Sequence, residues 1–471
     1  MEYSKYQLAL LEEVAHGTGN VIVQARAGSG KTTTIVESLK VVPTGKSILL
    51  CAFNKQNERT LSQRAPANVE TRTLHSIGYR AVRYAWGPVD VNTDKVKQMI
   101  DMLVPSAPFE ARTALSRLVS LSKNLIAETR EQIIDLAFQF NIETDNYSEE
   151  ELADFTLILL KECATRSTQI DYDDMIWLPK ILGLKLIQYD YVFVDETQDL
   201  NACQLWLTQH SCKAHGRIIA IGDDRQAIYA WRGADKDAME RMRVELSAKV
   251  MHLSICYRCP KNVIALARTV VPDIEAYETN PDGVINTISA DDFMSKFTPA
   301  PKDFVLSRTN APLMPICLAL LRRGIPATVA GREVANSLKS LIKRSRADNI
   351  PELVEWLNNY RVREIEKLHK HKKNGAMEVA INDKVDTVIA ISDGCVDPEE
   401  IMERIDSIFS DTDTTGKVIC STVHKAKGLE ANTVWMMIET FKPGRTQEET
   451  NIYYVAVTRS QNTLNIVRGK K

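Results

Sequence analysis

The feature that most constrains the fold of this 471-residue chain is the stretch 25–32, Ala-Arg-Ala-Gly-Ser-Gly-Lys-Thr. The apolar run 21–23 before it predicts a short buried strand, and residues 33–39 after it predict the first turns of a helix. A strand, a small-residue loop and a helix make a cradle for phosphate, because glycines let the backbone wrap closely and the N–H groups of the helix start face the anion. The sequence therefore predicts a nucleotide site at this loop.

Two side chains of the loop have chemistry suited to a nucleotide. The Lys31 ammonium can reach the β- and γ-phosphates, and the Thr32 hydroxyl can ligate Mg²⁺. We expect the nucleotide to be held by the loop and the first helical residues, which are Ala27, Gly28, Ser29, Gly30, Lys31, Thr32 and Thr33. One departure is Ala25, which stands where the usual pattern begins with glycine. The alternative is a chance match to a solvated Gly/Ser loop, and the strand-to-helix context argues against it.

Length, composition and charge set the broad class. The chain is too long for one ordinary core, so we expect two to four domains. A content of 44% apolar and 25% charged residues is typical of a globular protein. Because the formal net charge is only −2, a nucleic-acid surface would have to be a local groove.

The cysteine content and the hydropathy of the chain indicate the cellular compartment in which we expect the protein. Nine cysteines without framework spacing predict reduced thiols, and we interpret the one Cys-x-x-Cys, at Cys256 and Cys259, as coincidental. The polar residues 1–5 predict no secretory leader, and no stretch approaches the roughly twenty apolar residues of a membrane span. We therefore expect a soluble, cytoplasmic protein.

A second strand end carries two acids. The apolar run 191–194 predicts a strand that is followed at once by Asp195 and Glu196. In a phosphate-loop nucleotidase the first carboxylate holds Mg²⁺, partly through water, and the second takes the proton of the attacking water. Two acids at this place are otherwise often a helix N-cap, but their order after a phosphate loop favours the catalytic interpretation.

A third strand, predicted at 218–221, precedes a polar and aromatic segment at 222–234. The Gln226 amide could sense the γ-phosphate, and the Trp231 ring could stack on a nucleic-acid base. The alternative for Trp231 is burial in a domain interface, since large aromatic side chains are often buried.

Further polar residues stand near the same edge of the predicted sheet. The strand 47–53 ends in Phe53 and Asn54, and the stretch 71–76 contains His75. Ligands of open α/β sheets bind at the carboxyl ends of strands, although each of these ends alone would be an ordinary strand-to-loop transition. On the helix predicted at 3–15, Gln7 could read adenine with one donor and one acceptor, although such a side chain is usually only solvated.

Three further segments differ in composition from the predicted strands. Residues 80–165 predict a helical insertion that no strand interrupts. The acidic cluster 171–175 predicts a helix cap and not a metal site. The charged run 361–373 favours a solvated helix face over a contact with duplex DNA.

The motifs, taken in order, resemble those of the UvrD/Rep-like superfamily 1A DNA helicases. Later segments extend the resemblance: 256–258 is similar to motif IV, 306–310 to the motif after it, 421–430 to motif V and 453–460 to motif VI. The resemblance spans nearly the whole chain and is weak at 80–165 and 333–416. The compact chain suits a bacteriophage-type or F-box-helicase-like member and leaves no room for an appended nuclease.

The resemblance implies an α/β fold with two RecA-like P-loop NTPase domains, each a parallel sheet flanked by helices, and helical accessory insertions. It implies the following boundaries: an ATP-binding domain at 1–79 and 166–250, an insertion at 80–165, a second domain at 251–332 and 417–471, and a small insertion at 333–416. ATP with Mg²⁺ would lie between the two RecA-like domains.

The resemblance also implies roles for individual residues. Arg258 and Arg459 would act as arginine fingers, Gln7 and Tyr257 would hold adenine, and Glu430 would approach the ribose or phosphate side. With Lys31, Glu196 and Gln226, the two arginines complete the implied catalytic set. The residues that match family positions near single-stranded DNA are Phe53, Asn54, His75, Trp231, Arg308, His424 and Lys427.

The implied activity is that of an ATP-dependent DNA helicase or translocase that moves 3′→5′ on single-stranded DNA in replication, recombination or repair. Its partners would be single strands, junctions with duplex DNA and replication or recombination proteins. It would act as a monomer, in the cytoplasm, at the nucleoid, or in an infected host cell if viral. RNA remains an open substrate.

Two alternatives stay open. One is a DNA-stimulated ATPase that displaces proteins without processive unwinding. The other is a small-molecule kinase or GTPase. The sequence departs from the family at Arg26 (usually Gly), Arg225 (usually an acid), Ala227 (usually Ser) and Cys256 (commonly Asn), none of them a residue assigned to the chemistry.

Overall fold

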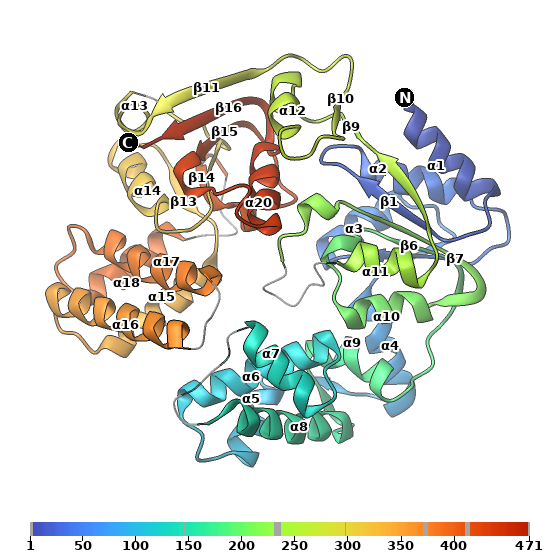
Figure 1. Ribbon diagram of the computed structural model, residues 1–471, viewed down its shortest axis with the longest axis horizontal. Coiled ribbons are helices and arrows are strands. Elements are labelled where there is room, and N and C mark those ends of the chain that lie inside the picture. The colour runs from blue at the N-terminus through green and yellow to red at the C-terminus, as the bar shows by residue number, and fades with distance from the viewer. Residues whose placement is uncertain are drawn as a thin grey trace. The chain divides into compact units, whose positions relative to one another are not determined.

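The computed structural model describes residues 3–140, 142, 144, 147–229, 237–296, 298–370, 375–409 and 415–469. The chain divides into two compact units, Met1–Ile255 and Cys256–Lys471. Each unit is built on one six-stranded sheet in which every pairing is parallel (Figure 1). The expected α/β fold with two parallel sheets flanked by helices is confirmed.

The sheet of the first unit has the order β3-β2-β6-β7-β1-β8. Its strands are β1 (Val21–Ala25), β2 (Ile48–Ala52), β3 (Val69–Thr73), β6 (Tyr189–Val194), β7 (Cys212–Gly222) and β8 (Lys249–Leu253). Strands β1, β2 and β6 are short and nearly continuous apolar runs that are buried along their length. Such runs are typical of parallel strands, because helices cover both faces of the sheet.

Successive residues of β1 belong to two separate hydrophobic cores. Ile22 belongs to the core that α4 (Leu74–Trp86), α9 (Tyr172–Ile181), α10 (Ala202–His210) and α11 (Ala238–Glu245) share. Its neighbour Val23 belongs to the core under α1 (Lys5–His16), α2 (Lys31–Lys40) and α3 (Lys55–Arg64). The alternation follows from the strand period of two, which points neighbouring side chains to opposite faces.

The described residues of the region 80–165 are mostly helical. It holds α5 (Lys95–Leu103), α6 (Phe109–Leu125), α7 (Arg130–Phe140) and α8 (Glu149–Thr165). The expectation of no strand is wrong at β4 (Asp90–Val91), which pairs in parallel with β5 (Gln169–Ile170) just beyond the region. Both β4 residues are exposed, so no apolar run announced the strand.

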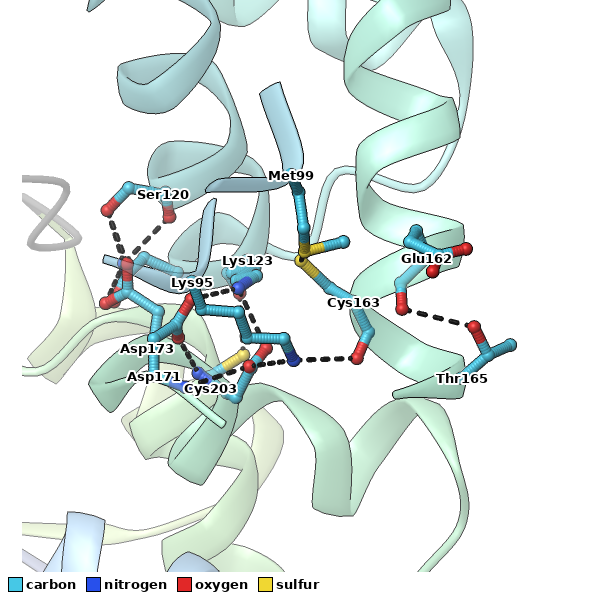
Figure 2. Close-up of polar contacts among 12 residues, drawn as sticks. Lys95, Met99, Ser120, Lys123, Glu162, Cys163, Thr165, Asp171, Asp173 and Cys203 are labelled. Carbon is cyan, nitrogen blue, oxygen red and sulfur yellow. Dashed lines mark hydrogen bonds and ion pairs between the residues drawn. The ribbon is translucent and has the colours of Figure 1, made fainter. Parts of the chain in front are cut away.

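Buried ion pairs join these helices to α9 (Figure 2). The Lys95 Nζ lies 2.7 Å from Asp174 Oδ2, and the Lys123 Nζ lies 2.7 Å from Asp171 Oδ2 and 2.8 Å from Asp174 Oδ1. Asp171 also caps α9 in a capping box with Asp174, which confirms the predicted cap. The same carboxylates therefore start a helix and neutralise two buried lysines.

The sheet of the second unit has the order β11-β16-β15-β12-β14-β13. Its strands are β11 (Val284–Ser289), β12 (Phe304–Ser307), β13 (Ala327–Val329), β14 (Val418–Thr422), β15 (Ala431–Met437) and β16 (Ser460–Arg468). The helices around it are α12 (Lys261–Ala267), α13 (Ala290–Ser295), α14 (Leu313–Arg322), α19 (Val423–Ala426) and α20 (Gln447–Val457). The short strands β9 (Ile255–Cys256) and β10 (Glu275–Ala276) form a separate pair.

Four further helices lie between β13 and β14. They are α15 (Arg332–Ser345), α16 (Ile350–Lys370), α17 (Gly375–Ser392) and α18 (Pro398–Ile408). Leu338, Leu357 and Val388 on these helices belong to the same core as Val305 of β12, and α18 contacts β13 of the sheet. Among the described residues, no helix combines the length and the apolar character needed to cross a membrane.

Candidate active site

The phosphate loop has the backbone that its glycines predict. Strand β1 ends at Ala25 and α2 begins at Lys31, and in between Gly28 (φ 67°) and Gly30 (φ 78°) are left-handed. Glycine adopts this conformation without a Cβ clash. Gly30 is the N-cap of α2 and brings no side chain to the N–H groups of the first turn. Those groups suit an anion, since the first N–H groups of a helix have no partner within it.

Three neighbouring strands bring the polar residues to this loop. In the sheet, β7 lies between β6 and β1, and the carboxyl ends of the three strands lead into Asp195, Asp223 and the loop. The Lys31 Nζ lies 2.9 Å from Glu196 Oε2. The predicted phosphate ligand and the predicted base are therefore brought into direct contact from residues far apart in the sequence.

The centre of the site is strongly acidic. The pKa of Asp195 is raised to about 7, chiefly by burial and next by the adjacent Glu196 carboxylate, while Lys31 acts in the opposite direction. Burial alone would lower the pKa of Lys31, but Glu196, Asp223 and Asp195 together raise it. A buried carboxylate whose charge is poorly compensated fits a site for a divalent cation.

The residues fit Mg²⁺ bound together with phosphates. Within the described residues no three His, Cys, Asp or Glu side chains gather as a metal cage. Mg²⁺ is typically bound through one or two carboxylates and substrate phosphates rather than through an all-protein cage. Asp195 and Thr32 can supply that small number of protein ligands.

Glu196 has an unusual backbone. Its φ of 53° and ψ of 44° are left-handed, which costs free energy for a residue with a side chain. Its N–H donates to Asp195 Oδ1 at 3.0 Å, and its Oε2 accepts from Gln198 Nε2 at 2.7 Å. Strain of this kind clusters at functional sites, and here it aims the acid at Lys31.

The segment after β7 is tied to the same centre. In the short helix η2 (Asp224–Gln226), the Gln226 Nε2 donates to Asp223 Oδ2 at 2.8 Å. The Asp223 N–H donates to Gln198 Oε1 at 2.9 Å. Gln198, in η1 (Thr197–Asp199), thus bridges two of the predicted site segments. Sequence reasoning gave it no role, although it stands two residues after Glu196.

Gln7 lies next to the phosphate-loop helix. Its Oε1 accepts from the N–H of Ser4, the N-cap of α1, and its Nε2 donates to Thr34 Oγ1 at 3.0 Å on α2. The capping box that fixes this amide was not anticipated, although Ser at the N-cap with Gln three residues later is its sequence signature.

In the second unit, the residues implied for the nucleotide gather at one edge of the sheet. Arg459 and Glu430 directly precede β16 and β15, and Arg258 forms an ion pair with Glu430. Arg459 is almost fully buried and donates to the carbonyls of Val455 (2.9 Å) and Leu429 (3.0 Å).

Tyr257 precedes Arg258 in the chain. Its ring contacts that of Tyr277, with 4.7 Å between centroids and an angle of 51° between the planes. The packing of the two rings holds one side of Tyr257.

The residues implied for DNA in the first unit include Phe53 and Asn54 after β2, which neighbours β6, and His75 after β3 at the edge of the sheet. Asn54 caps α3 by accepting from the Asn57 N–H at 2.8 Å, and Phe53 packs partly against the core. His75 is half-buried, and desolvation lowers its pKa. Trp231 lies outside the described residues.

The implied DNA residues of the second unit lie at the carboxyl ends of two adjacent strands. Arg308 follows β12, while His424 and Lys427 lie in and after α19, which follows β14. The Arg308 Nε lies 3.0 Å from Glu449 Oε1. Arg308 and His424 are therefore near the carboxyl ends of the strands, whereas Glu430 and Arg459 precede the amino ends of β15 and β16. Lys427 lies between the two groups, three residues before Glu430 in the chain.

Comparisons with known proteins agree with this arrangement. Residues 8–247, more than half of the chain, match the family model of the UvrD/REP helicase N-terminal domain, and residues 330–471 match that of the UvrD-like helicase C-terminal domain.

Relatives with similar sequences carry corresponding names. The F-box DNA helicase protein 1 of Schizosaccharomyces pombe is 24% identical over 97% of this chain and 56% of its own length. The ATP-dependent DNA helicase PcrA of Leuconostoc citreum is 25% identical, and that of Bacillus subtilis 24%, each over 55% of this chain and 38% of the relative. The aligned regions thus cover about half or less of these relatives' length. From its sequence motifs, its two parallel sheets and these matches, the chain belongs to the UvrD/REP helicase family.

Proposed function

We propose that this chain is an ATP-dependent DNA helicase or translocase that moves 3′→5′ on single-stranded DNA and serves replication, recombination or repair. One observation carries the proposal: Lys31, the Asp195–Glu196 pair and the Asp223–Gln226 pair meet at the ends of three adjacent parallel strands. Similar proteins are named ATP-dependent DNA helicases, which supports the choice of ATP and DNA.

In the proposed reaction Lys31 binds the β- and γ-phosphates, and Thr32 and Asp195 hold Mg²⁺. ATP supplies the phosphoanhydride bond whose hydrolysis drives movement. In the structure, Lys31 Nζ lies 2.9 Å from Glu196 Oε2. If the ammonium contacted phosphate oxygens instead, the Glu196 carboxylate would be available as the base for water. Gln226 would face the γ-phosphate.

The second unit would supply the remaining nucleotide contacts. We assign Arg258 and Arg459 as the cations that neutralise charge developing on the γ-phosphoryl group. Tyr257, with Gln7, would hold adenine, and Glu430 would approach the ribose. The ion pair between Arg258 and Glu430 would hold both side chains at the same edge of the sheet.

We propose the same domain boundaries for this activity. The two RecA-like domains would be 1–79 with 166–250 and 251–332 with 417–471, and the insertions would be 80–165 and 333–416. Single-stranded DNA would be held by Phe53, Asn54, His75, Trp231, Arg308, His424 and Lys427. Rings stack on bases and cations hold phosphates, so binding would be independent of sequence. We propose that the protein acts inside the cell as a monomer, on single-stranded DNA and on junctions between single-stranded and duplex DNA.

The deciding experiment measures ATP hydrolysis with and without single-stranded DNA, together with unwinding of duplexes that bear a 3′ or a 5′ tail. We expect strong stimulation by single strands and unwinding from the 3′ tail alone. Unwinding from the 5′ tail alone would refute the polarity. Stimulation without unwinding would support a translocase that displaces proteins. Hydrolysis at the same rate with and without DNA would support the kinase or GTPase interpretation.

A further inference from the structure

An arginine replaces the family's usual glycine directly after β1, and it is buried. Arg26 is 4% exposed. Its N–H donates to the Leu253 carbonyl of β8 at 2.9 Å, and its own carbonyl accepts from the Ser29 N–H at 3.1 Å. The backbone of Arg26 is therefore fixed both to the sheet and to the phosphate loop.

The guanidinium of Arg26 reaches the segment after β7. Its Nη1 lies 3.0 Å from Asp223 Oδ1 and 2.6 Å from Asp224 Oδ1. The Asp223 side chain is fully buried, whereas that of Asp224 is 37% exposed. A buried carboxylate depends on its partner much more than an exposed one does, because water cannot replace the lost contact.

Asp223 passes this constraint to Gln226. While Oδ1 meets Arg26, Oδ2 accepts from Gln226 Nε2 at 2.8 Å. The terminal torsion of a glutamine has broad, roughly twofold preferences, so a hydrogen bond decides which way the amide faces. With its nitrogen held by Asp223, the Gln226 amide has one defined orientation.

The contacts return to the phosphate loop by a second route. The Asp223 N–H donates to Gln198 Oε1, Gln198 Nε2 donates to Glu196 Oε2, and that oxygen meets Lys31 Nζ, at 2.9, 2.7 and 2.9 Å. A continuous set of polar contacts thus leaves the loop at Arg26 and rejoins it at Lys31.

We propose that Arg26 is a positioning residue that fixes Asp223, and through it the Gln226 amide, so that the site distinguishes a nucleoside triphosphate from a diphosphate. Arg26 touches no reacting atom in this scheme. The inference rests on the proposed nucleotide site at Lys31 and assigns a role to a residue that the family pattern does not call for.

The test compares affinities and needs no turnover. Dissociation constants for ADP and for a non-hydrolysable ATP analogue are measured by fluorescent-nucleotide displacement on the full chain and on Arg26→Gln and Arg26→Lys. For Arg26→Gln we expect the preference for the triphosphate to fall about tenfold, as for one lost charge-assisted contact, while ADP affinity stays within about twofold. Arg26→Lys keeps a cation beside Asp223, and its preference should lie between those of the wild type and Arg26→Gln.

Arg217→Gln is the matched control. Arg217 is also 4% exposed, belongs to the same sheet, and forms an ion pair with Glu13 at 3.0 Å. It lies in the middle of β7, six residues before Asp223. We expect this variant to melt at a lower temperature and to keep the triphosphate preference.

The outcomes separate the possibilities. An unchanged preference in Arg26→Gln, or a loss of equal size in Arg217→Gln, would overturn the positioning role and leave the nucleotide site intact. If Arg26→Gln does not fold, Arg26→Lys decides, and a wild-type preference in that variant refutes the inference. A wild-type chain that binds neither nucleotide would overturn the proposed function as well.

Discussion

The Lys31 ammonium lies 2.9 Å from the Glu196 carboxylate, across two strands that are not neighbours in the sheet. Strand β7 separates them, so the contact spans the site above the end of that strand. The cation assigned to phosphate binding and the acid assigned to water activation therefore hold each other. In the proposed reaction, a nucleotide that binds Lys31 would release the Glu196 carboxylate from this contact at the same time.

Lys31→Ala should abolish ATP hydrolysis, with a loss of about 10²-fold or more, because the cation that stabilises the transferring phosphoryl group is removed. Steady-state hydrolysis with saturating single-stranded DNA is the measurement. Circular dichroism and a melting curve should show a folded protein. Turnover near the wild-type rate would refute the assignment of the site.

The free energy of unfolding of the nucleotide-free protein should depend on pH through Asp195. Its pKa is raised from 3.8 to about 7, so between these values the folded state keeps a proton that the unfolded state has lost. The contribution of Asp195 to the free energy of unfolding therefore falls as pH rises through this window. Asp195→Asn should gain melting temperature relative to the wild type at pH 8 and gain little at pH 4.

The difference between the two proteins isolates this group, since other titrations are common to both. Metal chelator should be present in both series, because a bound cation would compensate the carboxylate. A difference in melting temperature that is the same at both pH values would contradict the raised pKa.

Lys123→Ala should destabilise the first unit by about 3–5 kcal/mol, because two buried carboxylates, Asp171 and Asp174, lose their shared cation. Urea unfolding followed by circular dichroism measures this cost. Adding Asp171→Asn to the variant should recover part of it, because Asp174 still has Lys95 as a partner. The control is Arg130→Ala in the same helical region, whose ion pair with Asp154 is exposed and should contribute nothing measurable.

Lys427→Ala should weaken binding of single-stranded DNA equally for all sequences. Removing one phosphate contact should also lower the slope of log K against log salt by about 0.7. Fluorescence anisotropy with labelled oligonucleotides at several salt concentrations measures both effects. Lys339→Ala, which loses an ion pair with Asp406 in the region 333–416, should leave the slope unchanged. Equal slopes for wild type and Lys427→Ala would refute the assignment of Lys427 to DNA binding.

Motifs at strand ends were predictable because local chemistry specified them. The apolar run before Lys31 and the acids after Val194 indicated parallel strands whose carboxyl ends meet, and the sheet order brings those ends together. The cap at Asp171 was predictable for the same reason, since an N-cap depends on residues three positions apart.

Contacts between distant residues were not predictable from the chain alone. Lys95 and Lys123 are charged and carry no local sign of burial, and only the packing of α5, α6 and α9 encloses them. Arg26 was visible as a departure from the family, but its partner Asp223 lies 197 residues away. The two-residue strand β4 has no apolar pattern to detect.

In the second sheet, the length of a strand separates the polar residues at the amino ends of the strands from those at the carboxyl ends. A rotation about one end therefore displaces the other. Glu430 precedes β15 and Arg308 follows the neighbouring β12, at opposite edges. A seven-residue strand such as β15 is about 23 Å long at ~3.3 Å per residue. A tilt of about 10° around one edge carries the other edge through about 4 Å, close to the ~3.4 Å spacing of nucleotides along a strand. Under the proposed function, a rotation of this size at the end near Glu430 would displace a DNA strand held near Arg308 by about one nucleotide, with every β-strand left intact.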